Sequence, residues 1–427
     1  MVAVSFPLWI EAQTRSVTLS EAIRLARRVS PDVVQAAGDY DAAGTTVRAA
    51  WGQYLPTLVG SADAGQSFFP SSGTRPDPVT GEIIGGANSN KSYGFGVSSS
   101  LTLFDGLGRV NQLHSARAGR EAAAARLGDQ QWRSTLATSL EFFSALQAQG
   151  VVRISQDELV RARDQFAVAL GKLRSGAATV SDSLRAVLVV NRARIRLMVA
   201  EDDLATAEAN LGRLVGTTGR VSAVDDSVFY RVGSPPDTAA IRLRALNEAP
   251  RVMAADATMR ARRAALTAAH GSYWPTVSLS ARTNYSGSQA QNYDVINNSS
   301  IGVALNWNIF DRFQRNRDID RSAVSYDVAQ AALADERRLL GAELTRHFAS
   351  LRTALRRIEF ARINLDAARA DLKVQSERYR LGSILIDNLQ TSQDALSAAE
   401  TEALNARIDY LRAKARIEAV TGRALDE

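Results

Sequence analysis

Histidine and cysteine are the residue types through which proteins most often bind transition metals, and this chain has few of them. His114, His270 and His347 are its only histidines, and each falls in a segment with a helical pattern. A zinc site on a helix needs two ligands three or four residues apart, and no such pair of histidines is present. The absence of cysteine excludes thiolate metal sites, disulfides and a cysteine nucleophile. We therefore expect neither a metal nor a cofactor.

Motifs for hydrolysis or nucleotide binding are also missing from the sequence. It has no nucleophile elbow, no phosphate-binding glycine loop and no zinc-protease motif. Gly106 and Gly108 form only a fragment of a nucleotide loop, and we interpret them as a joint between a strand and a helix. The sequence therefore predicts that the protein is not an enzyme.

The charge balance argues against a nucleic-acid partner. The 51 Lys and Arg residues are interleaved with 45 Asp and Glu residues, which leaves a net charge of +6. Nucleic-acid binding would need an uncompensated basic face with aromatic side chains, whereas mixed charges indicate solvated helix faces.

The N-terminal segment has some of the features of an export signal. Residues 1–16 include a short apolar run, Val2–Ile10, that is broken by Pro7. We interpret this segment either as the remnant of an export signal or as a disordered N-terminus. No stretch of the chain approaches the roughly 20 apolar residues of a membrane-spanning helix.

The sequence contains an internal repeat. Tyr54-Leu55-Pro56 recurs as Tyr273-Trp274-Pro275 at an offset of 219 in the numbering, and Phe104-Asp105 recurs as Phe310-Asp311 at an offset of 206. The offset of 206 also relates Arg109 to Arg315, Phe142 to Phe348, Gly176 to Gly382 and Gly216 to Gly422. The smaller second offset predicts that the first copy carries an inserted loop rich in Gly and Pro between Pro56 and Phe104. We therefore expect two structural repeats, 17–221 and 237–427, joined by a linker at 222–236.

Each repeat ends in a long segment without proline, which permits long helices. All ten prolines lie before residue 79 or between residues 235 and 275, and a proline inside a helix costs about 3 kcal/mol. Heptad spacing predicts antiparallel helical hairpins at about 109–216 and 315–422, with turns at Gly176 and Gly382. The first helix of each hairpin would be roughly 100 Å long. The heptad positions include Val152, Leu159, Phe166 and Leu173, and Leu344, Leu351, Ile358 and Leu365.

Short segments before the long helices alternate strictly between apolar and small or polar residues. They predict β-hairpins at about 57–104 and 276–310. One apolar face, one wet face and aromatic residues near the strand ends are typical of the wall of a transmembrane barrel. A half-buried sheet on a soluble domain is the alternative interpretation. The residues at which we expect contact with lipid are Phe95, Val97, Leu101, Ile301, Val303 and Leu305.

Two hairpins provide four strands, which are too few to close a barrel. A barrel in lipid has about eight strands or more, because open edges would leave backbone groups unpaired. We therefore expect several copies of the chain to assemble.

The order of these elements resembles the TolC-like outer-membrane efflux protein family over nearly the whole chain, from about Val17 to Gly422. The resemblance rests on the doubled hairpins, on Tyr-Leu-Pro and Tyr-Trp-Pro before the strands, and on Phe-Asp after them. It implies a mainly α fold with β, a tandem-repeat protomer of two β-hairpins and two long antiparallel helical hairpins. Three protomers would form a 12-stranded transmembrane β-barrel and a periplasmic α-helical barrel, with the linker in an equatorial region.

The resemblance also implies a function and partners. A protein of this family is a passive channel in the outer membrane of a Gram-negative bacterium, with a long periplasmic extension. It forms a homotrimer in outer-membrane lipid and exports small molecules or proteins together with a periplasmic membrane-fusion adaptor protein and an inner-membrane pump of RND, ABC or MFS type. The alternative function is a soluble or peripheral coiled-coil scaffold protein. Drugs, metals and secreted proteins all stay open as cargo.

Matched by position, the turns of the helical hairpins correspond to the adaptor-binding turns of the family. The residues concerned are Ser175, Gly176 and Ala177 in the first hairpin, and Leu381, Gly382 and Ser383 in the second.

The periplasmic gate of the family corresponds to three further residues. The resemblance implies that Asp182 is bonded by Tyr379 and that Asp387 lies in a constriction ring. The gate arginine of the family is not found, so closure would rest on Arg185 or Arg380 instead. From the residues alone, Asp182 is also expected as a helix N-cap, Tyr379 as a core residue and Asp387 as an ordinary exposed aspartate.

Overall fold

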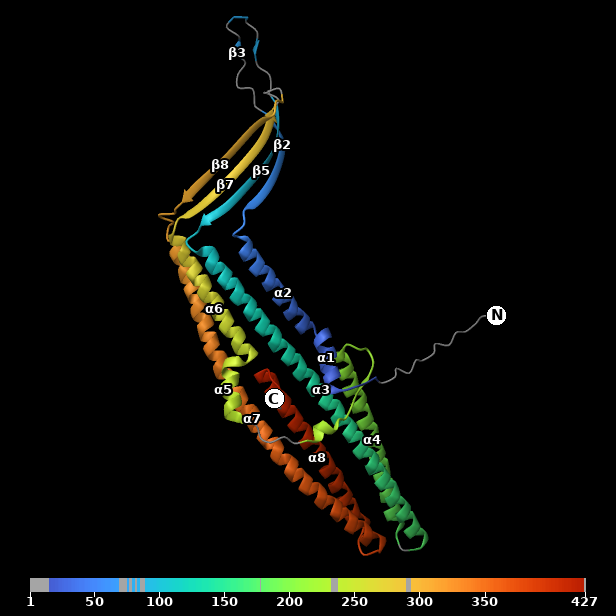
Figure 1. Cartoon of the computed structure of the whole chain (residues 1–427). Helices are drawn as coiled ribbons and strands as arrows, with labels where there is room; N and C mark the ends of the chain where they lie inside the picture. The colour runs from blue at the N-terminus through green and yellow to red at the C-terminus, as the bar shows by residue number, and fades with distance from the viewer. Residues whose placement is uncertain are drawn as a thin grey trace, which may run out of the picture. The chain divides into compact units, whose positions relative to one another are not determined.

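The computed structural model describes residues 15–68, 75–76, 79–80, 83–84, 89–176, 178–231, 237–288 and 293–425. Helices dominate, and the four longer strands form one sheet (Figure 1). In chain order the elements are β1 (Arg15–Val17), α1 (Leu19–Val29), α2 (Pro31–Gly52), β2 (Thr57–Phe68), β3 (Arg75–Pro76), β4 (Ile83–Ile84), β5 (Ser89–Phe104), α3 (Gly108–Arg174), α4 (Val180–Val215), β6 (Val221–Ala223), η1 (Ser227–Tyr230), α5 (Thr238–Glu248), α6 (Pro250–His270), η2 (Gly271–Tyr273), β7 (Thr276–Ser288), β8 (Ile296–Asn306), α7 (Gln314–Arg380) and α8 (Ile386–Thr421).

The internal repeat of the sequence is a repeat of structure. Both α3 and α7 have 67 residues and both α4 and α8 have 36, and each second copy begins and ends at the offset of 206 from the first. The shorter helices α1 and α5 both have 11 residues and are related by the offset of 219. A tandem-repeat protomer of two β-hairpins and two long helical hairpins is therefore confirmed.

One compact unit contains the helical hairpins except for the first parts of α3 (Gly108–Arg174) and α7 (Gln314–Arg380). It comprises the described residues of 15–40, 123–255 and 333–425. Within it α4 folds back along α3, and α8 folds back along α7 (Figure 1). Phe142 of α3, Leu211 of α4 and Ile417 of α8 are fully buried in a core that also contains Leu351 of α7. Burying each of these side chains contributes about 1.5–3 kcal/mol, so this shared core holds the four helices together.

Segments expected as a terminal extension and as a linker take part in this unit. β1 pairs in parallel with β6, and Val17, Val221 and Ala223 are buried there. Burial of these side chains offsets the entropy cost of ordering two short segments. Residues 15–16 therefore belong to a strand and not to a disordered N-terminus, and residues 222–223 belong to a strand and not to a linker. Residues 1–14 and 232–236 lie outside the described residues.

A second compact unit, made of the described residues of 41–122 and 256–332, contains the sheet. Its strand order is β2-β5-β7-β8, and all neighbours are antiparallel. The pairing of β5 with β7 joins the hairpins of the two repeats. Among the described residues, β2 and β8 each pair on one side only, so both edges of the sheet are open.

The β-hairpins differ in their boundaries from those predicted by the sequence pattern. β8 ends at Asn306, although apolar residues alternate as far as Ile309. Most of the insertion predicted between Pro56 and Phe104 lies outside the described residues, apart from the short pair β3 and β4. None of the described helices contains a segment long and apolar enough to cross a membrane.

Candidate functional site

The sheet has one apolar face, and the strand register decides which residues share it. Leu101 pairs with Leu279, which pairs on its other side with Val303. Phe95 pairs with Tyr285, and their rings stack with centres 4.9 Å apart. Because cross-strand partners lie on the same face, all residues expected to contact lipid share this apolar face. On β8, the residues of this apolar face are Ile301, which is 77% exposed, and Val303 and Leu305, which are each 66% exposed.

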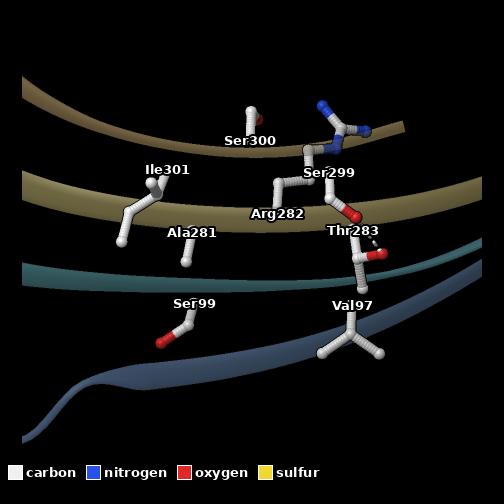
Figure 2. A pocket seen from close by; sticks show the side chains of 8 residues that line it. All are labelled: Val97, Ser99, Ala281, Arg282, Thr283, Ser299, Ser300 and Ile301. Carbon is white, nitrogen blue, oxygen red and sulfur yellow. Dashed lines mark hydrogen bonds between the residues drawn. The ribbon is translucent and has the colours of Figure 1, made fainter. Parts of the chain in front are cut away.

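The opposite face is polar or small. Gly94 of β5 pairs there with Asp63 of β2, and Ser98 of β5 pairs with Arg282 of β7. Figure 2 shows the division directly: Arg282 and Ser300 project to one side of the sheet, whereas Ile301 and its neighbours project to the other. A sheet with these two faces can separate a lipid phase from water.

An aspartate and an arginine hold the joint between strand and helix in the first repeat. The carboxylate oxygen Oδ2 of Asp105 accepts hydrogen bonds from the backbone N–H of Arg109 at 2.8 Å and from its Nε at 3.1 Å. The other guanidinium nitrogens of Arg109 donate to the carbonyl oxygens of Gln53 at 3.4 Å and Leu103 at 3.2 Å. The guanidinium carbon lies 5.0 Å from the ring centre of Tyr54. We call this arrangement the first Asp–Arg clasp.

The second repeat has the same arrangement, the second Asp–Arg clasp. Asp311 accepts from the backbone N–H of Arg315 at 3.0 Å and from its Nε at 3.1 Å. Arg315 also donates to the carbonyl oxygens of Ser272 and Ile309, at 3.3 Å and 3.2 Å. Its guanidinium carbon lies 5.0 Å from the ring centre of Tyr273. Each clasp thus ties the end of a strand, the start of a long helix and the preceding turn to one side chain.

Gly106 lies at the joint between β5 and α3, as the sequence indicates. Its φ of +64° is in the left-handed region. A Cβ there would lie 2.4 Å from the carbonyl oxygen of Gly271. Glycine is therefore required for the close approach of the two repeats, and this residue has a structural role.

The turn of each helical hairpin contains a glycine with positive φ. Gly176 has a φ of +74° and Gly382 a φ of +79°. In the second hairpin, the N–H of Gly382 donates to the carbonyl of Tyr379 at 3.0 Å, and that of Ser383 donates to the carbonyl of Arg378 at 2.9 Å. This pair of bonds is a Schellman motif, which ends α7. The expected adaptor-binding residues Ser175, Gly176, Leu381, Gly382 and Ser383 are all exposed, and Ala177 lies outside the described residues.

Tyr379 and Asp182 do not form the hydrogen bond that the resemblance implies. The Asp182 carboxylate accepts from the N–H and the hydroxyl of Thr179, at 3.0 Å and 2.8 Å, in a capping box that begins α4. These bonds lower the pKa of Asp182. The buried Tyr379 hydroxyl has no partner in the described part of the chain, and burial, followed by the charge of Asp182, raises its pKa. The N-cap of α4 is thus Thr179, and Asp182 is the N3 residue of the capping box rather than the N-cap expected from the residues alone. Tyr379 packs in the core.

Two other contacts connect the hairpins near their turns. Lys172 of α3 donates to the carbonyl of Tyr379, and its ammonium group lies 4.2 Å from the tyrosine ring centre. Arg185 of α4 donates to both carboxylate oxygens of Asp387 on α8, at 2.9 Å and 2.7 Å. Arg380 instead pairs with a glutamate in its own helix. Of the two arginines considered for closure, Arg185 bridges the hairpins, and Arg380 makes no such bridge among the residues that the structure describes.

Sequence reasoning missed Lys172 and the two clasps. The clasp residues carry a signal, because aspartate and arginine stand four residues apart at the same place in each repeat. Lys172 carries none, since its partner Tyr379 is 207 residues away. In the described part of the chain, no group of three or more His, Asp or Glu side chains could hold a metal ion.

Comparison with known proteins finds similarity to one protein family across most of the chain. A family model described as outer membrane efflux protein matches residues 22–217 and 242–423. Protein CyaE of Bordetella pertussis is 27% identical over 427 residues, an alignment that covers 98% of this chain and 87% of the relative.

Solved structures share the fold at lower identity. The channel CusC superposes with a TM-score of 0.80 at 16% identity, over 99% of this chain and 97% of its own. The Campylobacter jejuni CmeC outer membrane channel gives a TM-score of 0.78 at 14% identity, over 95% of this chain and 85% of its own.

Proposed function

The chain belongs to the outer membrane efflux protein family, and from this premise we propose that three copies of it form a passive export channel. The protein lies in the outer membrane of a Gram-negative bacterium, with a long periplasmic extension. The open edges of its sheet at β2 and β8 carry the proposal. In lipid, every backbone N–H and C=O needs a partner within the protein, so an open edge must be paired. In the trimer, β8 of one copy pairs with β2 of the next, which closes a barrel of twelve strands.

The two faces of the sheet then have separate roles. The exposed apolar face, with Ile301 and Val303, contacts lipid. The polar face, with Asp63 and Arg282, lines a water-filled lumen. The alternative function, a soluble or peripheral coiled-coil scaffold, would leave this apolar face in water, which is unfavourable for a sheet of this size.

The hairpin turns are the proposed contact with a periplasmic adaptor protein. Leu381 and Leu385, next to the turn of the second hairpin, are 76% and 72% exposed. Large apolar side chains in such positions favour a protein partner. The adaptor connects the channel to an inner-membrane pump, which supplies the energy for export of small molecules or proteins.

We propose that the channel is closed at its periplasmic end by contacts between the hairpins. Arg185 with Asp387 and Lys172 with Tyr379 hold the first hairpin to the second. Both partners of the Arg185–Asp387 pair are about half exposed, so the pair contributes at most about 1 kcal/mol. Such a contact can be opened by an adaptor without large cost.

The purified full chain in a planar lipid bilayer tests both the channel and its closure. We expect single-channel conductance that is low in the wild type and higher in the Arg185→Ala variant, because the hairpins separate more often. The double variant Arg185→Asp with Asp387→Arg restores the pair in reverse and should return the conductance toward the wild-type level. Arg380→Ala is the matched control, since it removes a cation near the same turns whose ion pair lies within α7.

Two results would count against this account. Equal conductance in wild type and Arg185→Ala, or an equal rise in Arg380→Ala, would remove the Arg185–Asp387 pair from the closure. A complete lack of conductance in every variant, with protein present in the bilayer, would contradict the channel itself.

A further inference from the structure

An apolar stripe runs along the outer side of α4. Its residues alternate in steps of four and three, which is the spacing of a coiled-coil seam. Its large apolar side chains are 56% to 61% exposed. α4 contacts α3 through a different face, which includes the buried Ala193. The residues of this α4 stripe are Leu184, Leu188, Asn191, Ile195, Met198 and Asp202.

A second stripe of the same kind runs along α7. Its large apolar side chains are 54% to 60% exposed. The buried face of α7 lies elsewhere and includes Leu351, Ala354 and Ala361. The residues of this α7 stripe are Val374, Ala370, Ala367, Ile363, Phe360 and Arg356.

The two stripes have matching positions relative to the hairpin turns, which lie at the same end of this unit (Figure 1). The number of residues between Ile195 and the turn glycine Gly176 equals the number between Ile363 and the turn glycine Gly382. The same equality holds for Asp202 with Arg356. A helix has a constant rise per residue, so these pairs lie at equal heights when the turns are level. The other pairs of equal height are Leu184 with Val374, Leu188 with Ala370, Asn191 with Ala367 and Met198 with Phe360.

At the ends of the stripes that lie farthest from the hairpin turns, the charged side chains are of opposite sign and unpaired. Asp202 is flanked by Glu201 and Asp203, and all three side chains are exposed. Arg356 has Arg352 one turn away on α7, and two like charges at this spacing repel each other. No ion pair joins any of these side chains to another residue that the structure describes. An acidic partner would relieve the repulsion between the arginines.

Within one chain the two stripes cannot meet. α3 and α8 contact each other, for example through Gln147 and Asn405, and they lie between α4 and α7 (Figure 1). The stripes therefore face outward at the two edges of the four-helix layer. Because the two edges are complementary to each other, a second copy of the chain fits against each of them, and head-to-tail contacts of this kind can close a ring.

We propose that α4 of one copy packs antiparallel against α7 of the next, with Asp202 facing Arg356 as the pair that sets the register. This inference rests on the proposed trimer and specifies how its helices join. A slip by one heptad would place Asp202 against Ile363 or Ala349, and Arg356 against Ile195 or Ala209. Each slip buries charged groups without partners, whereas the apolar residues alone would tolerate it.

Cysteine pairs test the register directly, because the chain has no cysteine of its own. The variant Ile195→Cys with Ile363→Cys places the two thiols at equal heights. Under mild oxidation of membranes that contain the full chain, it should form disulfide-linked dimers and trimers that a reductant separates. The matched control, Ile195→Cys with Val374→Cys, places the thiols roughly 16 Å apart along the helix axis, beyond the reach of a disulfide. It should stay at the size of one chain.

The outcomes separate this inference from the proposed function. If the protein is trimeric by light scattering in detergent but only the control pair forms crosslinks, or neither pair does, the register is wrong and the trimer stands. If the protein is monomeric in detergent, the trimer itself fails.

A charge exchange provides a second, independent readout. The Asp202→Arg variant should lower the fraction of trimer in detergent, because it places a cation against Arg356. Adding Arg356→Asp to it should restore the trimer. Failure of the second substitution to restore it would overturn the role of the pair.

Discussion

Replacing Arg315 by alanine is expected to destabilise the sheet unit by about 3 kcal/mol, because the change leaves the Asp311 carboxylate without its cation. The two side chains are only 14% and 19% exposed, so water compensates little for the loss. The variant also loses donors to the carbonyl oxygens of Ser272 and Ile309 and the contact with the Tyr273 ring. The measurement is the thermal unfolding midpoint of the purified protein in detergent, followed by circular dichroism.

Two variants make this test specific for the second Asp–Arg clasp. Arg315→Lys keeps the charge but loses the planar fork of donors, so it should lie between alanine and wild type. Arg317→Ala removes a neighbouring arginine that is 67% exposed and pairs with the exposed Asp318, and it should leave the midpoint nearly unchanged. If Arg315→Ala unfolds at the wild-type temperature, the clasp does not hold the joint as argued.

The second large effect is expected from a charge on the apolar face of the sheet. Val303→Arg and Leu305→Arg should each cost about 2–4 kcal/mol if the residues lie near the middle of the bilayer. Val303 and Leu305 are exposed in the single chain, so these substitutions create no clash inside the sheet. The expected result is a loss of assembled protein from the outer membrane fraction, measured by the amount of trimer that resists detergent.

A neighbouring position on the same strand supplies the control. Ser300 projects to the opposite side of the sheet from Ile301 (Figure 2). Ser300→Arg should therefore enter the lumen and leave assembly close to the wild-type level. Normal assembly of Val303→Arg, or equal loss in Ser300→Arg, would show that the apolar face does not contact lipid.

Elements of this fold that are built from a periodic residue pattern are predictable from the sequence, because the pattern recurs many times along each element. The absence of proline and the heptad spacing predict two helical hairpins, and α3, α4, α7 and α8 follow them closely. Alternation of residue types predicts β5, β7 and β8, and the register places Phe95 and Val303 on one shared face of the sheet. The resemblance to TolC-like proteins is likewise confirmed by the family match over most of the chain.

Features that depend on a single distant contact are not predictable in this way. The pairing of β1 with β6 involves three residues on each side, which is too short for any period to be visible. Asp387 meets Arg185 across 202 residues of sequence, and Lys172 meets Tyr379 across 207. The Asp182 carboxylate is used by Thr179, three residues away, and local capping therefore prevails over the long-range bond that the resemblance implies.

The mass of the complete protein in detergent tests the central claim, that four strands with open edges are sealed only by other copies. Native mass spectrometry of the full chain should show a particle of three chains, each of 46.1 kDa, that loses its solubility when detergent is removed. A single chain that stays monodisperse in plain buffer would contradict the channel, since its open edges and apolar face would then need neither partner nor lipid.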